Sequence, residues 1–320
     1  MPTTSDAPPP VAVYGCGTIG ASWATLFALN PAVAGEVRLF DITAEARAAG
    51  RAKIDAMLAT VAGLTSAQRT AAQARLKVCA TSAEALAGVG FIQESVLERY
   101  PIKADTHADI ERHAPVQALV ASSSSGLLAS KMQETWTHPE RFLVGHPFNP
   151  PHLIPLVELV PGPRTSEAAL AAAGAFYTAL GKIPVVLRKE VPGHIANRLA
   201  AAVWREALDL VDHGVASLED VDKALCAGPG LRWALMGQHL IYHLNGGAKG
   251  YAGFFDQFES QFAKWWEDMA RWTAIPPGAK TAALAQIAAA ADGKSVAELE
   301  ARRDRQLQAI LAVLKADAQD

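Results

Sequence analysis

The hydrophobic positions of this chain follow one pattern in residues 1–190 and a different one after them. In the first part, short apolar, β-branched runs alternate with longer Ala-rich or charged stretches, as in α/β proteins. The apolar runs predict eight strands, over residues 11–14, 37–40, 77–80, 90–93, 117–121, 142–144, 156–160 and 184–187. The stretches between them predict helices over residues 19–30, 43–61, 66–75, 101–113 and 166–180. Since the strands are apolar without alternation, we expect a parallel sheet with helices on both faces.

Beyond residue 190 the apolar residues recur at helical spacing. Pro192 and Gly193 interrupt the chain, and residues 194–214 then read as an amphipathic helix. Further helices are predicted over residues 218–227, 233–244, 254–273, 279–291 and 295–316, with no strand among them. The pattern therefore predicts an α/β domain over residues 1–190, followed by an all-α C-terminal domain over residues 191–320.

A glycine-rich turn follows the first predicted strand. Residues 15–20 read Gly-Cys-Gly-Thr-Ile-Gly and open the first predicted helix. Glycines at this spacing permit a tight turn, the approach of a pyrophosphate and close helix packing. The candidate cofactor contacts are Gly15, Gly17, Thr18, Ile19 and Gly20. Asp41 ends the second strand, where a carboxylate binds an adenosine ribose and repels a 2'-phosphate. The first domain is therefore predicted to be of the Rossmann type and to bind NAD.

His146 and Glu158 are the strongest candidates for acid–base chemistry. His146 follows the strand predicted at 142–144 and precedes a proline-rich loop, whereas Glu158 interrupts an otherwise apolar strand. A buried, unpaired carboxylate is strongly destabilising, so we expect Glu158 to bind one imidazole nitrogen and leave the other as a general base. The alternative is a loop histidine without a role and a glutamate that points to solvent.

Three weaker groups of polar residues complete the candidates. Residues 122–125 are serines at the carboxyl end of a predicted strand, and they form either part of a ligand site or an ordinary loop. Asn197 lies one turn into the helix after Gly193, where it binds a ligand or caps a neighbour. His239 and His243 lie four residues apart, but the sequence offers no third metal ligand in register, so no metal is expected.

Composition and charge exclude several classes of partner. The chain has 320 residues, with 29 Lys and Arg against 32 Asp and Glu, a balance that disfavours nucleic acid and anionic membranes. No stretch reaches the ~18 apolar residues of a membrane helix. Residues 1–10 lack the features of a targeting signal, and the expected location is the cytoplasm. Three widely separated cysteines are expected to be small packing residues.

With these residues identified, the chain resembles the L-3-hydroxyacyl-CoA dehydrogenase superfamily over residues 11–316. The resemblance rests on Gly-His-Pro-Phe-Asn-Pro at 145–150, Leu-Val-Glu at 156–158, and Val-Pro-Gly-His-Ile-Ala-Asn-Arg-Leu at 191–199. It implies that His146 and Glu158 are catalytic and that Ser124 and Asn197 bind the substrate oxygen. It also implies that Glu98 and Lys103 lie near the nicotinamide. His194 departs from the family, in which a phenylalanine is common at this position.

Within the superfamily, the chain is most similar to the branch of L-carnitine dehydrogenase and the lambda-crystallin type L-gulonate 3-dehydrogenases. The telling residues are Gly-Leu-Arg-Trp-Ala at 230–234 and Ser-Val-Ala-Glu-Leu-Glu at 295–300. The resemblance implies an oxidoreductase that oxidises an L-3-hydroxy acid with NAD. Arg232 and Trp233 are the candidate contacts to a free carboxylate, because a guanidinium binds a carboxylate through two parallel hydrogen bonds.

Two alternatives to this function remain open, and one association is expected. The first alternative is an L-3-hydroxyacyl-CoA dehydrogenase. The second is a non-enzymatic binding or structural protein with the same fold. The helical domain carries Trp265, Trp266 and Trp272 on apolar faces that exceed what a small domain buries. Together with the family analogy, these tryptophans predict a homodimer.

Overall fold

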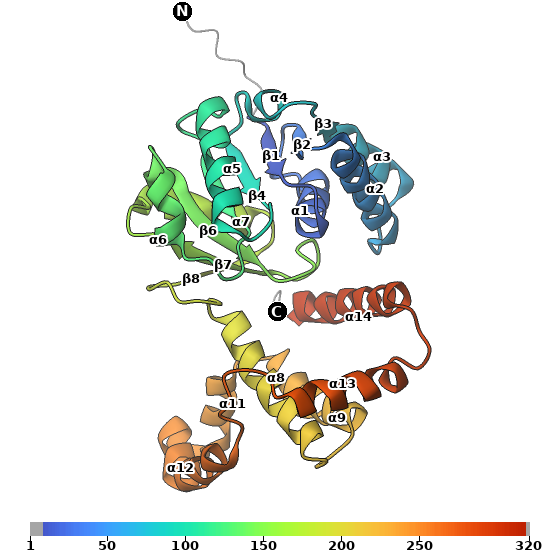
Figure 1. Ribbon diagram of the computed structural model, residues 1–320, viewed down its shortest axis with the longest axis vertical. Coiled ribbons are helices and arrows are strands. Elements are labelled where there is room, and N and C mark those ends of the chain that lie inside the picture. The colour runs from blue at the N-terminus through green and yellow to red at the C-terminus, as the bar shows by residue number, and fades with distance from the viewer. Residues whose placement is uncertain (1–8, 318–320) are drawn as a thin grey trace, which may run out of the picture. The chain divides into compact units, whose positions relative to one another are not determined.

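The computed structural model describes residues 9–317 and divides into two compact units, Met1–Asn197 and Arg198–Asp320 (Figure 1). Residues 1–8, which make up most of the segment examined for a targeting signal, lie outside the described range. The division falls at the start of helix α8 (Ala196–Asp212), while the change in hydrophobic pattern predicts a boundary at residue 190. Residues 191–197 group with the sheet because their backbone and side chains bind residues of unit 1.

Unit 1 is built on one sheet of eight strands, in the order β3-β2-β1-β4-β5-β6-β7-β8. The strands are β1 Val11–Tyr14, β2 Val37–Phe40, β3 Leu76–Val78, β4 Phe91–Glu94, β5 Leu119–Ser122, β6 Phe142–Pro147, β7 Leu156–Pro161 and β8 Ile183–Val186. All eight predicted strands form, with some ends displaced. The Rossmann-type α/β fold class is confirmed.

One pair of neighbouring strands departs from the expected parallel sheet. Strands β6 and β7 pair antiparallel, whereas the other neighbours are parallel. Only residues 148–155 connect them, which is too short for the crossover of a dozen or more residues that parallel strands require. The prediction is also wrong about His146, which lies inside β6 rather than in the loop after it.

Helices cover both faces of this sheet. They are α1 Thr18–Leu29, α2 Ala44–Thr60, α3 Ser66–Arg75, α4 Ser82–Leu86, α5 Tyr100–His113, α6 Ala129–Met132 and α7 Glu167–Ala179, with short 3-10 helices at Gln133–Thr135 and Pro139–Arg141. Side chains alternate across a strand. Val13 therefore packs in the core with Trp23 of α1 and Tyr177 of α7, while Tyr14 packs in the opposite core with Ile110 of α5.

Unit 2 consists of helices joined by loops, with no strand in its described part, residues 198–317. After α8 come α9 Leu218–Ala227, α10 Pro229–Trp233, α11 Gln238–Asn245, α12 Gly250–Asp268, α13 Pro277–Ala290 and α14 Val296–Asp317, with a 3-10 helix at Gly247–Lys249. Helices α11 and α12 pack together. The helix predicted at 233–244 begins later, at Gln238 after the N-cap Gly237, because residue 233 ends the preceding short helix α10. Cys226 is exposed, so the packing role expected for it is wrong.

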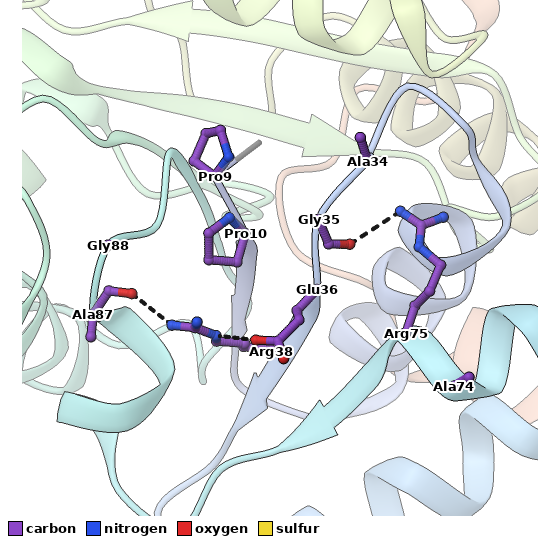
Figure 2. Close-up of a pocket in the computed structure, with 10 residues that line it drawn as sticks. All are labelled: Pro9, Pro10, Ala34, Gly35, Glu36, Arg38, Ala74, Arg75, Ala87 and Gly88. Carbon is purple, nitrogen blue, oxygen red and sulfur yellow. Dashed lines mark hydrogen bonds and ion pairs between the residues drawn. The ribbon is translucent and has the colours of Figure 1, made fainter. Parts of the chain in front are cut away.

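A cavity of about 900 Å³ lies at the amino ends of the strands (Figure 2). Its lining includes Pro10, Glu36 and Arg75, which directly precede β1, β2 and β3, and Gly88 in the loop before β4. Both of its arginines are bound to the protein: Arg38 donates to the Ala87 carbonyl at 2.6 Å, and Arg75 to the Gly35 carbonyl at 3.3 Å. Because α/β sheets of this kind bind ligands at the carboxyl ends of the strands, we expect the functional site at the opposite edge.

Candidate active site

The glycine turn at the carboxyl end of β1 has the shape needed to receive a pyrophosphate. Gly15 has φ +98°, and a Cβ there would lie 2.7 Å from the Ser95 carbonyl. A Cβ on Gly20 would lie 1.8 Å from the Gly15 carbonyl oxygen. A Cβ on Gly17 would meet no atom within 4 Å. Gly17 is also the N-cap of α1 and offers no side-chain cap, so open space lies beside the unsatisfied N–H groups of a helix N-terminus. Thr18 and Ile19 form the first turn of this helix.

Asp41 lies beside this turn. One of its carboxylate oxygens accepts a hydrogen bond from the Cys16 N–H at 2.7 Å, and the other accepts from the Ile42 N–H at 2.8 Å. Arg47 donates to the Asp41 carbonyl oxygen at 2.7 Å. The carboxylate is thus fixed next to the glycine turn at the end of β2, which places its negative charge where the sequence pattern expects a ribose.

Antiparallel pairing of β6 and β7 places His146 directly opposite Glu158. The His146 Nδ1 lies 2.9 Å from the Glu158 Oε2, and the two residues are 4% and 1% exposed. The other carboxylate oxygen, Oε1, accepts hydrogen bonds from the Ile195 N–H at 2.8 Å and the Ala196 N–H at 2.9 Å. Both oxygens of Glu158 therefore have partners, as a buried carboxylate requires.

These contacts keep Glu158 ionised and determine which nitrogen of His146 donates to it. Burial acts to raise the pKa of the Glu158 carboxyl, but the hydrogen bonds from His146, Ala196 and Ile195 outweigh it and hold that pKa below its usual range. An ionised carboxylate can only accept, so the Nδ1 of His146 must carry the proton that it donates. The Nε2 of the neutral imidazole is then unprotonated and available as a base.

Ser124 and Glu98 form a second polar pair, at the ends of β5 and β4. Ser124 is 2% exposed, and its Oγ donates to Glu98 Oε1 at 2.8 Å. The same oxygen accepts from the Gly126 N–H at 2.6 Å. Burial acts to raise the pKa of Glu98, but the bonds from Ser124, Gly126 and Leu127 dominate and lower it. Glu98 therefore fixes the loop that carries Ser124.

Lys103 lies in the interior beneath this loop. Its Nζ is 2.7 Å and 2.9 Å from the two carboxylate oxygens of Glu94 and 3.3 Å from the Ser122 Oγ. Lys103 is 1% exposed. Burial acts to raise the pKa of Glu94, but the charge of Lys103 and contacts with His107 lower it to about 2. Sequence reasoning assigned no role to Glu94. The available signal was a carboxylate in an apolar run, as for Glu158.

Residues 194–197 bring two further side chains to the serine loop. The Asn197 Nδ2 donates to the Ser125 carbonyl at 3.2 Å, and the His194 Nε2 lies 3.1 Å from the Ser124 carbonyl oxygen. His146, Glu158, Ser124 and Asn197, far apart in sequence, are thus all connected to the same group of elements in unit 1. Sequence reasoning noticed His194 only as a departure from the family and assigned it no contact.

The remaining candidates belong to unit 2. Arg232 is exposed on α10. The nearby acid Asp220, a possible surface partner for it, pairs with Lys223. The Trp233 Nε1 donates to the Gln238 side chain. His239 binds the Tyr251 hydroxyl, and within residues 9–317 no group of three His, Cys, Asp or Glu side chains is arranged to hold a metal ion. No helix in the same range is long and apolar enough to cross a membrane.

Comparison with known proteins gives consistent matches over both units. Residues 10–191 match the family "3-hydroxyacyl-CoA dehydrogenase, NAD binding domain", and residues 193–282 match "3-hydroxyacyl-CoA dehydrogenase, C-terminal domain". L-Carnitine dehydrogenase of Streptomyces coelicolor is 41% identical over 301 residues, covering 94% of this chain and 93% of that protein. The L-carnitine dehydrogenase of Pseudomonas aeruginosa is 42% identical over 311 residues, covering 95% and 93%.

Solved structures with similar folds include other dehydrogenases. The NAD+-dependent dismutase 5-formyl-3-hydroxy-2-methylpyridine 4-carboxylic acid 5-dehydrogenase has a TM-score of 0.78 and 25% identity, covering 96% of this chain and 98% of that one. The (S)-3-hydroxybutyryl-CoA dehydrogenase of Ralstonia eutropha has a TM-score of 0.63 and 26% identity, covering 88% and 94%.

Proposed function

This chain belongs to the 3-hydroxyacyl-CoA dehydrogenase family and is an NAD-dependent dehydrogenase, and from that premise we propose that it oxidises L-carnitine, a free L-3-hydroxy acid, to the 3-keto acid. The observation that carries the chemistry is the buried pair of His146 and Glu158, 2.9 Å apart. Relatives that are about 40% identical over most of the chain and are named L-carnitine dehydrogenases support the choice of substrate.

His146 acts as the general base of this reaction. Its unprotonated Nε2 takes the proton of the C3 hydroxyl as the C3–H bond breaks and its electron pair leaves as hydride. NAD supplies the hydride acceptor when it is bound. Glu158 fixes the imidazole tautomer and stabilises the imidazolium that forms, since its carboxylate stays ionised.

Ser124 and Asn197 are assigned to the oxygen that changes from alcohol to carbonyl. In the free protein the Ser124 hydroxyl hydrogen is directed to Glu98, and the Asn197 amide to the Ser125 carbonyl. The only hydrogen of the C3 hydroxyl is directed to His146, so Ser124 can bind this oxygen only as a donor. Donation to the product carbonyl requires the hydroxyl to turn from Glu98, so the role proposed for Ser124 includes this rotation.

NAD binding is assigned to the glycine turn, Asp41, Glu98 and Lys103. The open space at Gly17 and the helix N-terminus behind it fit a pyrophosphate, and Asp41 fits an unphosphorylated ribose. Glu98 and Lys103 act near the nicotinamide through the loops that they hold, because both side chains are engaged with neighbouring protein groups.

The substrate carboxylate is assigned to Arg232, with Trp233 beside it. A guanidinium can bind a free carboxylate through two charge-assisted hydrogen bonds, whereas a thioester offers no charge to it. The structural relative whose name specifies a 4-carboxylic acid supports an acid substrate. L-Gulonate, which the resemblance to its branch suggests, and a 3-hydroxyacyl-CoA are the competing substrates.

We also infer a cytoplasmic homodimer. Trp265 and Trp266 on α12 are 49% and 63% exposed, which supports their burial in a subunit contact. Trp272 fits this role less well, because it is half-buried and its Nε1 donates to Asp209 at 3.0 Å. Three free cysteines are consistent with a reducing compartment. Light scattering of the purified protein measures the subunit number.

A substrate panel tests the proposed function. Initial rates of NAD reduction at alkaline pH, which favours release of the proton, are compared for L-carnitine, L-gulonate, 3-hydroxybutyrate and 3-hydroxybutyryl-CoA. We expect the highest kcat/KM for L-carnitine. A clear preference for the CoA thioester would replace the free-acid assignment with the acyl-CoA one, and a preference for gulonate would change the acid.

Substitution of Arg232 tests the same assignment from the protein side. Loss of a hydrogen bond to a charged group removes about 1.5–3 kcal/mol, so Arg232→Met should raise KM for the acid roughly 10- to 100-fold with the KM for NAD unchanged. Arg232→Lys should recover only part of the loss. An unchanged KM for the acid in Arg232→Met would show that Arg232 does not bind the substrate.

A further inference from the structure

His194 occupies an unusual backbone position next to the proposed catalytic pair. Its φ is +52°, in the left-handed region that non-glycine residues seldom adopt, and it follows Gly193 with φ +76°. The side chain is nonetheless 1% exposed, and its ring centroid lies 5.1 Å from that of His146. Strained backbone is retained where the surroundings demand it, and such positions cluster at functional sites.

The contacts of His194 fix its tautomer. The Nε2 lies 3.1 Å from the Ser124 carbonyl oxygen, and a carbonyl can only accept, so the Nε2 carries the hydrogen. The Nδ1 of the neutral ring is then unprotonated. It is buried and has no hydrogen-bond partner among the residues that the structure describes. A proton added to His194 would therefore go to a buried atom with no acceptor.

The same residue joins the two halves of the site. Its side chain holds the carbonyl of Ser124, and the next two residues, Ile195 and Ala196, donate their backbone N–H groups to Glu158. A displacement of residue 194 would move both the serine loop and the donors that keep Glu158 ionised. Phenylalanine, which has no donor, could fill the space but could not make the bond to Ser124.

We propose that His194 is a positioning residue of the dehydrogenase: as the neutral Nε2–H tautomer it ties the Ser124 loop to the turn that holds Glu158, and the enzyme is active only while His194 is neutral. This inference rests on the proposed role of His146 as the base. A cation on His194 would lie beside the imidazole of His146, disfavour proton uptake there, and weaken the base.

Charged and titratable groups on two strands and one loop face His194. They are His146 on β6, Glu158 on β7 and Glu98 after β4. Burial lowers the pKa of His194, and the neighbouring His146 lowers it further, while the bond to Ser124 and the charges of Glu158 and Glu98 act in the opposite sense and are outweighed. Protonation of His194 is thus confined to acidic pH.

Three variants separate the hydrogen bond from the shape of the ring and from the backbone. His194→Gln keeps an amide donor near the position of Nε2 without a titrating group. His194→Phe keeps a ring of similar size without the donor. His194→Asn suits a left-handed backbone but its amide is too short to reproduce the Nε2 donor.

The kinetic test compares these variants in the oxidation of L-carnitine with NAD. Leaving the Ser124 carbonyl without its partner should lower kcat roughly 10- to 100-fold in His194→Phe and His194→Asn, with the KM for NAD unchanged. His194→Gln should recover most of the loss. The acid limb of log kcat/KM should approach a slope of two in the wild type, since two imidazoles must be neutral, and a slope of one in His194→Gln.

A measurement without turnover keeps this inference separate from the substrate assignment. Imidazole ¹⁵N spectra of the wild-type protein, assigned with the His194 variants, should show His194 as the Nε2–H tautomer with a pKa below 6.5. Wild-type kcat in His194→Phe, a slope of two retained in His194→Gln, or an Nδ1–H tautomer would each overturn the proposal. Absence of carnitine oxidation with the expected tautomer and pKa would instead count against the proposed substrate, and the kinetic test would then use the best acid of the panel.

Discussion

At the scale of single residues, the site depends on how two carboxylates are satisfied. Glu158 receives two backbone N–H groups on one oxygen and an imidazole on the other, and Glu98 receives a hydroxyl and backbone N–H groups. Hydrogen bonds hold the pKa of each below its usual range, Glu158 in the interior and Glu98 on an exposed loop. The charge that polarises His146 and the charge that fixes the Ser124 loop are therefore part of the folded protein before any ligand binds.

Removal of the base should separate binding from chemistry. His146→Ala is expected to lower kcat by the ~10²- to 10⁴-fold that accompanies loss of a general base, with the dissociation constant for NAD unchanged. Glu158→Gln should lose less, because the imidazole remains but is held without a charge. Stopped-flow or steady-state rates together with NAD titration check both variants. Wild-type turnover in His146→Ala would exclude the proposed pair from the reaction.

Asp41 is expected to set the preference for NAD over NADP. Its carboxylate repels a 2'-phosphate and also accepts the Cys16 N–H, so two variants are needed to separate charge from structure. Asp41→Asn retains an acceptor for Cys16 without the charge, whereas Asp41→Ala loses both. Both variants should lower the ratio of kcat/KM for NAD to kcat/KM for NADP by roughly tenfold or more, as expected when the charged contact of Asp41 with the ribose is lost. Equal use of both cofactors by the wild type would contradict the role of Asp41.

At the scale of the elements, the sequence predicted the positions of the strands better than their directions in the sheet. The central strands were recognisable because they are buried on both faces and therefore apolar, and the edge strands β3 and β8 because they too are rich in apolar, β-branched residues. An apolar run does not tell which way it pairs. The eight residues between β6 and β7 excluded a crossover, so the antiparallel pair could have been predicted from connection length. That direction is what places His146 opposite Glu158.

The site was predictable where a residue broke its local pattern. Glu158 is a carboxylate in an apolar strand, and the glycines of residues 15–20 follow a strand at a diagnostic spacing. The ion pair of Glu94 with Lys103 and the hydrogen bond of His194 to Ser124 were not predicted. In each, the two residues lie on different segments of the chain, and only the folded structure shows that these segments are neighbours.

The glycine turn offers a test at this scale, because two of its glycines are required for different reasons. Gly17 has φ −63° and open space around it, so Gly17→Ala should unfold at the wild-type temperature but bind NAD more weakly. Gly20→Ala places a methyl group against the Gly15 carbonyl and should cost about 1–3 kcal/mol of stability. Thermal denaturation and calorimetric titration with NAD distinguish them. Tight NAD binding by Gly17→Ala would mean that the pyrophosphate lies elsewhere.

At the scale of the whole molecule, the stability of unit 1 should depend on pH through a buried lysine. Lys182 follows α7 and is 6% exposed, with its Nζ donating to the carbonyls of Pro151 and Ile154 in the loop between β6 and β7. No carboxylate is among its hydrogen-bond partners within the described range. Burial lowers the pKa of Lys182 from 10.5 to about 7.

The sign of the effect follows from proton binding. Between about pH 7 and pH 10.5 the unfolded chain holds a proton on Lys182 that the folded protein has released, so the free energy of unfolding rises with pH across this window. Lys182→Met should lack this rise. Denaturant unfolding of both proteins at several pH values measures the difference. Parallel pH dependences would show that Lys182 keeps its ordinary pKa in the folded state.

The two N–H groups that hold Glu158 have a consequence for how this sequence can diverge. Because the donors at residues 195 and 196 are main-chain atoms, almost any side chain can replace Ile195 or Ala196 without removing a partner from the carboxylate. Proline is the exception, since it lacks the donor. Selection at these two positions should therefore exclude proline but favour no particular side chain. Homologues can vary residues 195 and 196 widely while Glu158 keeps its charge.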